Sequence, residues 1–318
     1  MHEATGSSDT MTDEATARFV ASPFGVALAH AQRRRGRQLA DLCDLRDATA
    51  RRLLAEYGAM FLADDVVRVP PACVFYNNDE VERFQASTQM RAHALRVRAN
   101  ASAEGDDETA GAANDTNDTN DDAAASAETN ATVTIELQAA ALAALLAARE
   151  EVLTLVPGGL GLTPRGGVEA ARRGYADTVR LWHSRVYPAL DHWMAQNRLS
   201  VAAAEQVRLL APHEQLAPVL AWEAQGLFFS KDFAKSILYS VAAPGASQHL
   251  SLLAFDVAEF ADSSVRAALA RHGWFQTVLS DLPHFTYLGV READLPDLGL
   301  RRCVAPGGEQ VFWVPRVV

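Results

Sequence analysis

Residues 244–256 read PGASQHLSLLAFD and residues 280–289 read SDLPHFTYLG. Short aromatic and β-branched pieces within them, residues 255–257 and 285–288, alternate with Pro and Gly, which is typical of strands in an antiparallel sheet. The chain before Gly226 is instead dominated by helical periodicity. Helices first and strands later predict an α+β fold, in which a helical N-terminal part packs on a small antiparallel sheet.

Helical and extended patterns alternate over the first half of the chain. Between residues 38 and 60, apolar side chains recur at three- and four-residue steps, which predicts one amphipathic helix. Residues 66–75 hold two prolines among β-branched residues and predict a short extended segment, and residues 79–85 begin another helical stretch. Residues 133–137 alternate like a strand, and residues 138–153 are rich enough in Ala and Leu to predict a helix.

Two further helical patterns precede the strands. Residues 168–196 predict one long helix, which we expect to bend near Pro188 because proline lacks a backbone N–H. Residues 201–225 predict a helix or a pair of helices, broken near Pro212 and Pro218.

Changes in composition suggest where the chain divides. Residues 1–37 are interpreted as an N-terminal tail or degenerate signal whose apolar part ends in the small-x-small pattern of signal cleavage, with a short surface helix as the alternative. Residues 38–99 form an N-terminal helical segment. Residues 100–131 have hardly any apolar bulk and predict a disordered acidic insertion. Residues 132–318 form the domain that contains the two quoted stretches.

The formal net charge of −11 is concentrated in that insertion. Nine acidic residues follow one another there with no Lys or Arg between them: Glu104, Asp106, Asp107, Glu108, Asp115, Asp118, Asp121, Asp122 and Glu128. Since the rest of the chain is close to neutral, its charge does not predict nucleic-acid binding. The chain lacks a run of about 18 apolar residues, so a transmembrane helix is not expected. The cysteines Cys43, Cys73 and Cys303 form no CxxC or Cys/His cluster, so neither a disulfide framework nor a cysteine zinc site is expected.

Candidate metal ligands lie in the two quoted stretches. His249 and Asp256 are seven residues apart on a loop that leads into a predicted strand, and His284 follows Asp281 by three residues. Two imidazoles and a carboxylate form one complete protein ligand set for catalytic Zn²⁺. Such an ion keeps its fourth position for a water molecule, whose pKa it lowers towards about 7. A second carboxylate close by can then accept that water's proton.

The two stretches resemble the zinc D-alanyl-D-alanine carboxypeptidases related to the vancomycin-resistance dipeptidase and to the zinc domain of hedgehog proteins. Those proteins carry the pattern SxHxxGxAxD, followed by ExxH. Ser247, His249, Ala254 and Asp256 fill the first pattern, while Leu252 replaces its glycine.

In the second pattern the family often reads EPWHFRYVG, where this chain has DLPHFTYLG from Asp281 onward. Carried over position by position, the resemblance implies that His249, Asp256 and His284 are the zinc ligands. It also implies that Asp281 takes the place of the family's glutamate base. Aspartate is shorter than glutamate by one methylene, about 1.5 Å of reach.

The resemblance extends to substrate binding. The family holds the terminal carboxylate of its substrate with an arginine in a YRS-like segment, and a guanidinium fork suits both oxygens of a carboxylate. Arg173, in ARRGYAD at residues 171–177, is the candidate, with Lys231 as the second choice. Ser247 is also expected to contact substrate. The specific resemblance covers about residues 226–289.

The resemblance implies a zinc peptidase-like domain over residues 132–318, which we expect to cleave the D-Ala-D-Ala end of peptidoglycan stem peptides. The family implies a periplasmic or extracytoplasmic location. An alternative is a catalytically weak or inactive zinc-containing module that binds cell-wall peptides, because Asp281 is the shorter acid. A third alternative is a purely helical interaction protein whose histidines are incidental.

Overall fold

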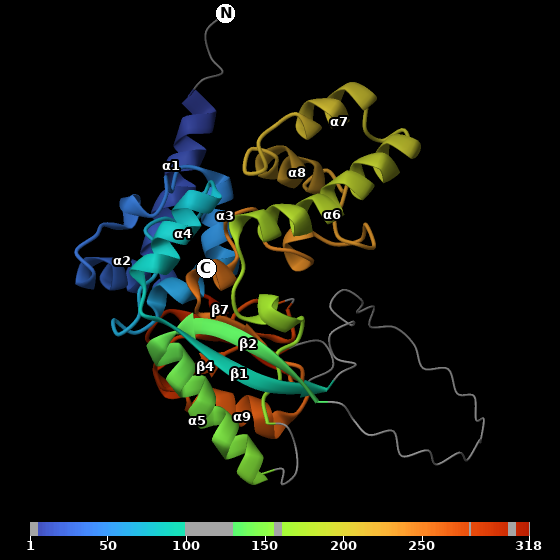
Figure 1. Cartoon of the computed structure of the whole chain (residues 1–318). Helices are drawn as coiled ribbons and strands as arrows, with labels where there is room; N and C mark the ends of the chain where they lie inside the picture. The colour runs from blue at the N-terminus through green and yellow to red at the C-terminus, as the bar shows by residue number, and fades with distance from the viewer. Residues whose placement is uncertain (1–5, 99–129, 156–160, 280, 305–309, 318) are drawn as a thin grey trace, which may run out of the picture.

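The computed structural model describes residues 6–98, 130–155, 161–279, 281–304 and 310–317. Over these residues the chain is an α+β protein with three small antiparallel sheets, as predicted (Figure 1). The α-helices are α1 (Gly6–Ala21), α2 (Pro23–Arg34), α3 (Ala48–Tyr57), α4 (Asn78–Ser87), α5 (Ala139–Leu155), α6 (Tyr175–Ala195), α7 (Val201–Arg208), α8 (Leu216–Glu223) and α9 (Ser263–Arg271). The strands are β1 (Met90–Arg98), β2 (Asn130–Gln138), β3 (Ala254–Asp256), β4 (Trp274–Phe275), β5 (His284–Tyr287), β6 (Leu300–Val304) and β7 (Val311–Pro315). Short 3₁₀ turns are η1 (Leu39–Asp41), η2 (Gly58–Leu62), η4 (Gly167–Ala170), η5 (Ile237–Tyr239), η6 (Gln248–Ser251) and η7 (Glu292–Asp294).

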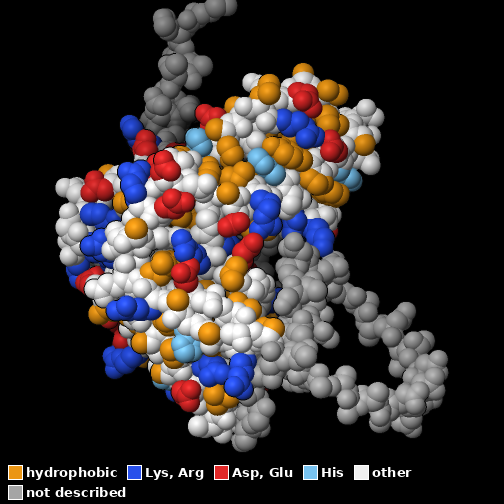
Figure 2. Space-filling model, in the orientation of Figure 1, with side chains coloured by type: hydrophobic (Ala, Val, Ile, Leu, Met, Phe, Trp, Pro, Cys, Tyr) orange, Lys and Arg blue, Asp and Glu red, His pale blue; other side chains and the backbone are white. Residues whose placement is uncertain are grey.

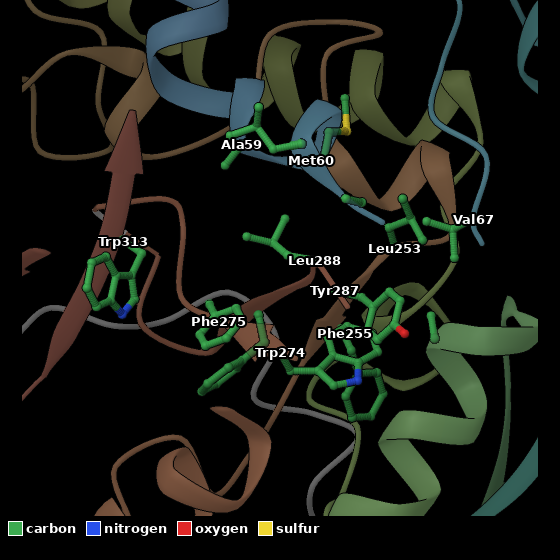
Figure 3. Close-up of a cluster of buried hydrophobic side chains, with 14 of the residues drawn as sticks. Ala59, Met60, Val67, Leu253, Phe255, Trp274, Phe275, Tyr287, Leu288 and Trp313 are labelled. Carbon is green, nitrogen blue, oxygen red and sulfur yellow. The ribbon is translucent and has the colours of Figure 1, made fainter. Parts of the chain in front are cut away.

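The main core lies between the N-terminal helices, the β1–β2 hairpin and the three-stranded sheet. In Figure 1 the hairpin crosses in front of the sheet region, and α5 runs beside α9 below it. Figure 3 shows aromatic side chains of β3, β4 and β5 facing the apolar residues of η2. The labelled members of this core are Ala59, Met60, Val67, Leu253, Phe255, Trp274, Phe275, Tyr287, Leu288 and Trp313. The helical N-terminal part therefore packs on the sheet, as the sequence predicted.

A second core belongs to the helical lobe formed by α6, α7 and α8, at the upper right of Figure 1. Trp182 and Trp193 of α6 are buried in it, and Trp182 Nε1 donates to Gln215 Oε1 at 3.0 Å. Tyr57, the last residue of α3, also belongs to this core. Figure 2 shows hydrophobic side chains gathered on the face of the same lobe that is turned to the viewer.

The N-terminal segment contributes to the main core. Ser22 caps α2 by accepting a hydrogen bond from Gly25 N at 3.0 Å, and Pro23 occupies the first helical position. Phe24 and Leu28 of α2 are fully buried. The sequence predicted a tail, a degenerate signal or a surface helix here, whereas the structure has two helices, of which α2 buries its inner face.

The helix predicted over residues 38–60 is interrupted in the structure. A turn in which Asp47 N donates to Asp44 O at 3.1 Å separates η1 from α3. The Asp47 side chain then accepts from Thr49 N at 2.8 Å and so starts α3 as a new helix. The apolar periodicity was correct for α3, but the turn at Asp44 and the N-cap at Asp47 divided the pattern.

The long helix predicted over residues 168–196 begins late, because residues 167–170 form η4 and α6 starts only at Tyr175. Pro188 lies inside α6, as expected. The pattern over residues 201–225 is a helix pair, α7 and α8, with Pro212 between them. Pro218 does not break α8, because it lies in the first turn, where its missing N–H has no helical partner to lose.

Three other predictions concern residues 66–75, the acidic insertion and membrane-spanning helices. Residues 66–75 form no strand, although Val67 and Phe75 are buried. Residues 100–129 of the predicted acidic insertion lie outside the described residues, and the pairing of Arg98 with Asn130 makes the insertion the connection between β1 and β2. In the described part of the chain, no helix is both long and apolar enough to cross a membrane.

Candidate metal centre

Two neighbouring strands and the turn before them bring the predicted metal ligands together. Asp256 is the last residue of β3 and His284 the first of β5, and the antiparallel register places them directly opposite each other. His249 lies in η6, the 3₁₀ turn that leads into β3. These short elements occur where the sequence predicted strands, so the strand signal also positions the candidate ligands.

The backbone turns sharply between His249 and the strand. Leu252 ends η6 with φ 60° and ψ 28°, in the left-handed region that favours glycine. This is the position at which the resembled pattern has its glycine, so the conformation explains why a glycine suits it. The leucine is fully buried, and its apolar contacts offset the strain of a left-handed backbone.

The ligand atoms of His249, Asp256 and His284 all lie within 4.8 Å of one another, and all three residues are buried. His249 Nε2 is 3.3 Å and His284 Nδ1 is 3.1 Å from the same oxygen, Asp256 Oδ1. The two imidazole rings meet edge to face, with centroids 4.9 Å apart. For tetrahedral zinc with bonds of about 2.0–2.1 Å, neighbouring donor atoms stand about 3.3 Å apart. The two histidine–aspartate distances match this spacing, and the two histidine nitrogens lie within 4.8 Å of each other.

His249 is a buried imidazole without a hydrogen-bond partner among the described residues. Its side chain is 1% exposed, and neither Nδ1 nor Nε2 makes a hydrogen bond, although Nε2 lies 3.3 Å from Asp256 Oδ1. Burial, followed by the charge of Arg173, lowers the pKa of His249 to about 4. The ring is therefore neutral near pH 7, with a lone pair free for a cation. Buried polar atoms are usually hydrogen-bonded, so the lack of a hydrogen-bond partner for His249 supports a metal-ligand role.

Asp256 is held ionised by the groups around it. Burial alone would raise the pKa of its carboxyl group, but His249, His284 and Arg173 lower it well below the usual value. Oδ2 accepts a hydrogen bond from Arg173 Nη2 at 2.9 Å, while Oδ1 faces the two imidazoles. One oxygen is thus reserved for the guanidinium and the other for the candidate metal position.

Arg173 reaches Asp256 because α6 starts late. The residue lies in the connection between η4 and α6, and its Nε donates to Glu169 O at 3.2 Å. Gln85 of α4 holds this connection, because its Nε2 donates both to Arg173 O and to Leu250 O of η6. Helix α4 thereby joins the arginine to the turn that carries His249.

Asp281, the expected base, lies three residues before His284 and is half-buried. Burial and the negative charge of Asp256 raise the pKa of Asp281. Its backbone carbonyl accepts from His284 N at 3.3 Å, and its carboxylate makes no hydrogen bond or ion pair with any described residue. The acid is thus electrostatically coupled to the cluster and has a free carboxylate.

The comparisons with known proteins add no family. A scan against family models, a search of curated proteins and a search of solved structures each found no match. The functional interpretation therefore depends on the residues and geometry of this chain.

The structure distinguishes among the remaining predicted site residues. Of the two candidates for binding a carboxylate, Arg173 lies in the cluster, whereas Lys231 is exposed on the connection between α8 and η5. Ser247 is buried directly before η6, and its backbone carbonyl accepts from Leu250 N. A hollow of about 510 Å³ lies between α2 and residues 296–299, and none of its lining residues belongs to the cluster.

Sequence reasoning missed Gln248, which is fully enclosed beside the cluster. Its Oε1 lies 2.9 Å from His284 Nε2, on the side of the ring opposite Asp256. The missed signal was its position next to His249, in a turn whose four residues are all buried. Gln85 was also missed, because its importance depends on contacts with residues more than 80 positions away.

Proposed function

We propose that this chain is a zinc-dependent peptidase of the D-alanyl-D-alanine carboxypeptidase type. The observation that carries the proposal is the convergence of His249, Asp256 and His284 around one point, with their ligand atoms within 4.8 Å of one another. The order of these residues, with Asp281 three positions before the second histidine, matches the resembled patterns. The left-handed backbone at the motif's glycine position adds support from conformation.

The donor set suits a resident Zn²⁺ ion. His249 and His284 would each supply one imidazole nitrogen and Asp256 would supply Oδ1, leaving one tetrahedral position open. When bound, zinc supplies Lewis acidity, which makes a water molecule nucleophilic near neutral pH. Arg173 keeps Asp256 ionised and oriented, as hydrogen-bonding partners of ligating carboxylates do.

Asp281 is the proposed general base. Its raised pKa makes the carboxylate a better proton acceptor near neutral pH than an ordinary surface aspartate. It takes the proton of the attacking water and afterwards gives it to the leaving amine nitrogen. The carboxylate has no competing partner among the described residues, so it is available for both transfers.

Arg173 is the proposed contact for the free C-terminal carboxylate of the substrate. Its Nη2 is engaged by Asp256 and its Nε by Glu169 O, whereas Nη1 makes no hydrogen bond with the described residues. Nη1 can donate to a carboxylate oxygen next to the scissile bond. Such a contact favours peptides that end at that bond, including the D-Ala-D-Ala ends of peptidoglycan stem peptides.

A second candidate is a zinc-containing module that binds cell-wall peptides without cleaving them. Two observations favour it: aspartate replaces the longer glutamate at residue 281, and Asp256 already occupies Nη2 of Arg173. A shorter base and a partly engaged arginine both reduce catalysis more than they reduce metal binding.

Elemental analysis of the full chain tests the metal. We expect about one zinc per chain in the wild type and none in His249→Ala, together with loss of hydrolysis of peptides ending in D-Ala-D-Ala. His213→Ala, which removes a histidine from the connection between α7 and α8, is the matched control and should keep both. Full activity of the zinc-free His249→Ala chain would contradict the proposal, as would a wild type that binds no zinc.

Variants at residue 281 separate the enzyme from the binding module. For an enzyme, Asp281→Asn should lower kcat at least about 100-fold with zinc content unchanged, because a general base typically contributes 10²–10⁴-fold. Asp281→Glu should retain or raise kcat. If neither the wild type nor Asp281→Glu hydrolyses any D,D- or L,D-peptide, while both bind such peptides, the module is the correct assignment.

A further inference from the structure

Gln248 occupies a sealed position between the two cores, where every polar atom of its side chain has a partner. The residue is 2% exposed. Its Nε2 donates to Tyr57 O at 2.8 Å and lies 3.4 Å from Thr277 Oγ1. Its Oε1 lies 2.9 Å from His284 Nε2 and also accepts from Thr286 Oγ1. The side chain of Gln248 thus lies between the end of α3 and the side chains of His284 and Thr286 in β5.

The partners of Gln248 determine which way its amide points. A backbone carbonyl can only accept a hydrogen bond, so the atom that faces Tyr57 O must be the NH₂ group. Flipping the amide would set two carbonyl oxygens against each other at 2.8 Å. The side-chain oxygen therefore faces His284.

The hydroxyl groups agree with this orientation. Thr286 donates its only hydroxyl hydrogen to Gln248 Oε1, so it accepts from Thr277 Oγ1, 2.6 Å away. Thr277 in turn can accept from Gln248 Nε2. Each donor among these groups has an acceptor, and Gln248 Oε1 acts only as an acceptor.

The state of the His284 ring follows from the amide. Because Oε1 can only accept, the nitrogen that faces it, Nε2, must carry a hydrogen. The other nitrogen, Nδ1, lies on the side of Asp256 and His249. With a hydrogen held on Nε2, Nδ1 is the nitrogen that can offer a lone pair to a cation at the candidate metal position, where it lies 3.1 Å from Asp256 Oδ1.

We propose that Gln248 is a positioning residue, whose side-chain carbonyl holds a hydrogen on His284 Nε2 and so makes Nδ1 the metal-binding nitrogen. Its effect on zinc affinity rests on the proposed function, whereas its effect on the ring is a property of the chain alone. Ligating histidines generally donate their second N–H to a partner that fixes the ring, and removing such partners typically weakens metal binding 10–100-fold.

NMR spectra of the full chain with ¹⁵N-labelled histidine, recorded without metal, test the inference directly. In the wild type we expect a hydrogen on His284 Nε2. In Gln248→Met, which has similar length and no amide oxygen, the ring should carry its hydrogen on Nδ1, where Asp256 accepts it, and none on Nε2. Gln248→Glu should rescue the wild-type pattern, because a protonated glutamate can donate to Tyr57 O and accept from His284. Gln215→Met, which removes a buried amide from the helical lobe, should leave the His284 signals unchanged.

Zinc affinity, measured by competition with a chelating dye, gives the second readout. Gln248→Met should bind zinc 10–100-fold more weakly than the wild type, and Gln248→Glu and Gln215→Met should bind within a few-fold of it. A wild-type spectrum without a hydrogen on Nε2 overturns the inference and needs no folded variant. Unchanged affinity and an unchanged ring in Gln248→Met also overturn it while leaving the proposed function intact. The wild type could bind no zinc while the hydrogen on His284 still moves as expected in Gln248→Met. In that case the proposed function fails, and the role of Gln248 in placing that hydrogen is upheld.

Discussion

Asp256 lies directly opposite His284 in the register of β3 and β5, and its Oδ1 is 3.1 Å from His284 Nδ1. The other oxygen, Oδ2, is bonded to Arg173 Nη2. The carboxylate therefore bridges a guanidinium and the imidazole pair. Arg173 is the permanently charged group bonded to this carboxylate.

Replacing Arg173 with Met should destabilise the metal-free protein by about 3 kcal/mol, because it leaves a buried carboxylate without its partner. Added zinc should raise the melting temperature of this variant more than that of the wild type, because the ion restores the missing positive charge. Arg180→Met is the control, since Arg180 pairs with Glu169 at the surface and its loss should cost at most about 1 kcal/mol. Equal losses in the two variants, measured by urea unfolding without metal, would argue against a structural role for the buried pair.

The sequence predicted which three residues form the candidate cluster, but not the residues around them. His249, Asp256 and His284 could be proposed from their residue types and the resembled patterns, and the short aromatic pieces bounded by Pro and Gly predicted the strands whose pairing brings Asp256 and His284 together. The position of Arg173 could be proposed only by resemblance, since helical periodicity suggested that α6 began earlier. Gln248 was not predicted, because its contacts with Tyr57 and Thr286 depend on tertiary packing.

Stability of the metal-free protein should fall as the pH is lowered from about 6.5 to about 4, owing to His249. The folded state lowers the pKa of this ring from 6.5 to about 4, so over that interval the unfolded chain binds a proton that the folded chain excludes. Protonation then favours unfolding, with a cost of about 3 kcal/mol by pH 4. The free energy of unfolding of His249→Gln should decrease over this interval by about 3 kcal/mol less than that of the wild type. Urea unfolding at each pH provides the measurement. Parallel curves for the two proteins would show that His249 is not held neutral.

Gln32 offers a contrast with Gln248, because it is fully buried in α2 and neither atom of its amide has a hydrogen-bond partner among the described residues. A buried unsatisfied amide costs about 1–3 kcal/mol, so Gln32→Met should increase the free energy of unfolding by about 1 kcal/mol or more. Gln215→Met should have the opposite sign, since it removes the acceptor of the buried Trp182 indole N–H. Chemical denaturation of both variants provides the measurement, and a destabilised Gln32→Met would mean that the amide is satisfied in solution.

Leu252 should reverse the usual order of alanine and glycine substitutions. Both Leu252→Ala and Leu252→Gly lose nearly the same buried side chain, but only alanine keeps a Cβ at φ 60°. A left-handed backbone costs a non-glycine residue roughly 1–2 kcal/mol, so the glycine variant should be the more stable of the two by about 1 kcal/mol.

Leu145, fully buried in the interior of α5, provides the matched control. Leu145→Gly should be less stable than Leu145→Ala by about 1 kcal/mol, because glycine is the poorer helix former. The zinc affinity of Leu252→Gly should also exceed that of Leu252→Ala, since the turn at residue 252 places His249 against Asp256. If alanine is the more stable substitution at both positions, the backbone at residue 252 is not left-handed, and the conformational link to the glycine of the resembled pattern is lost.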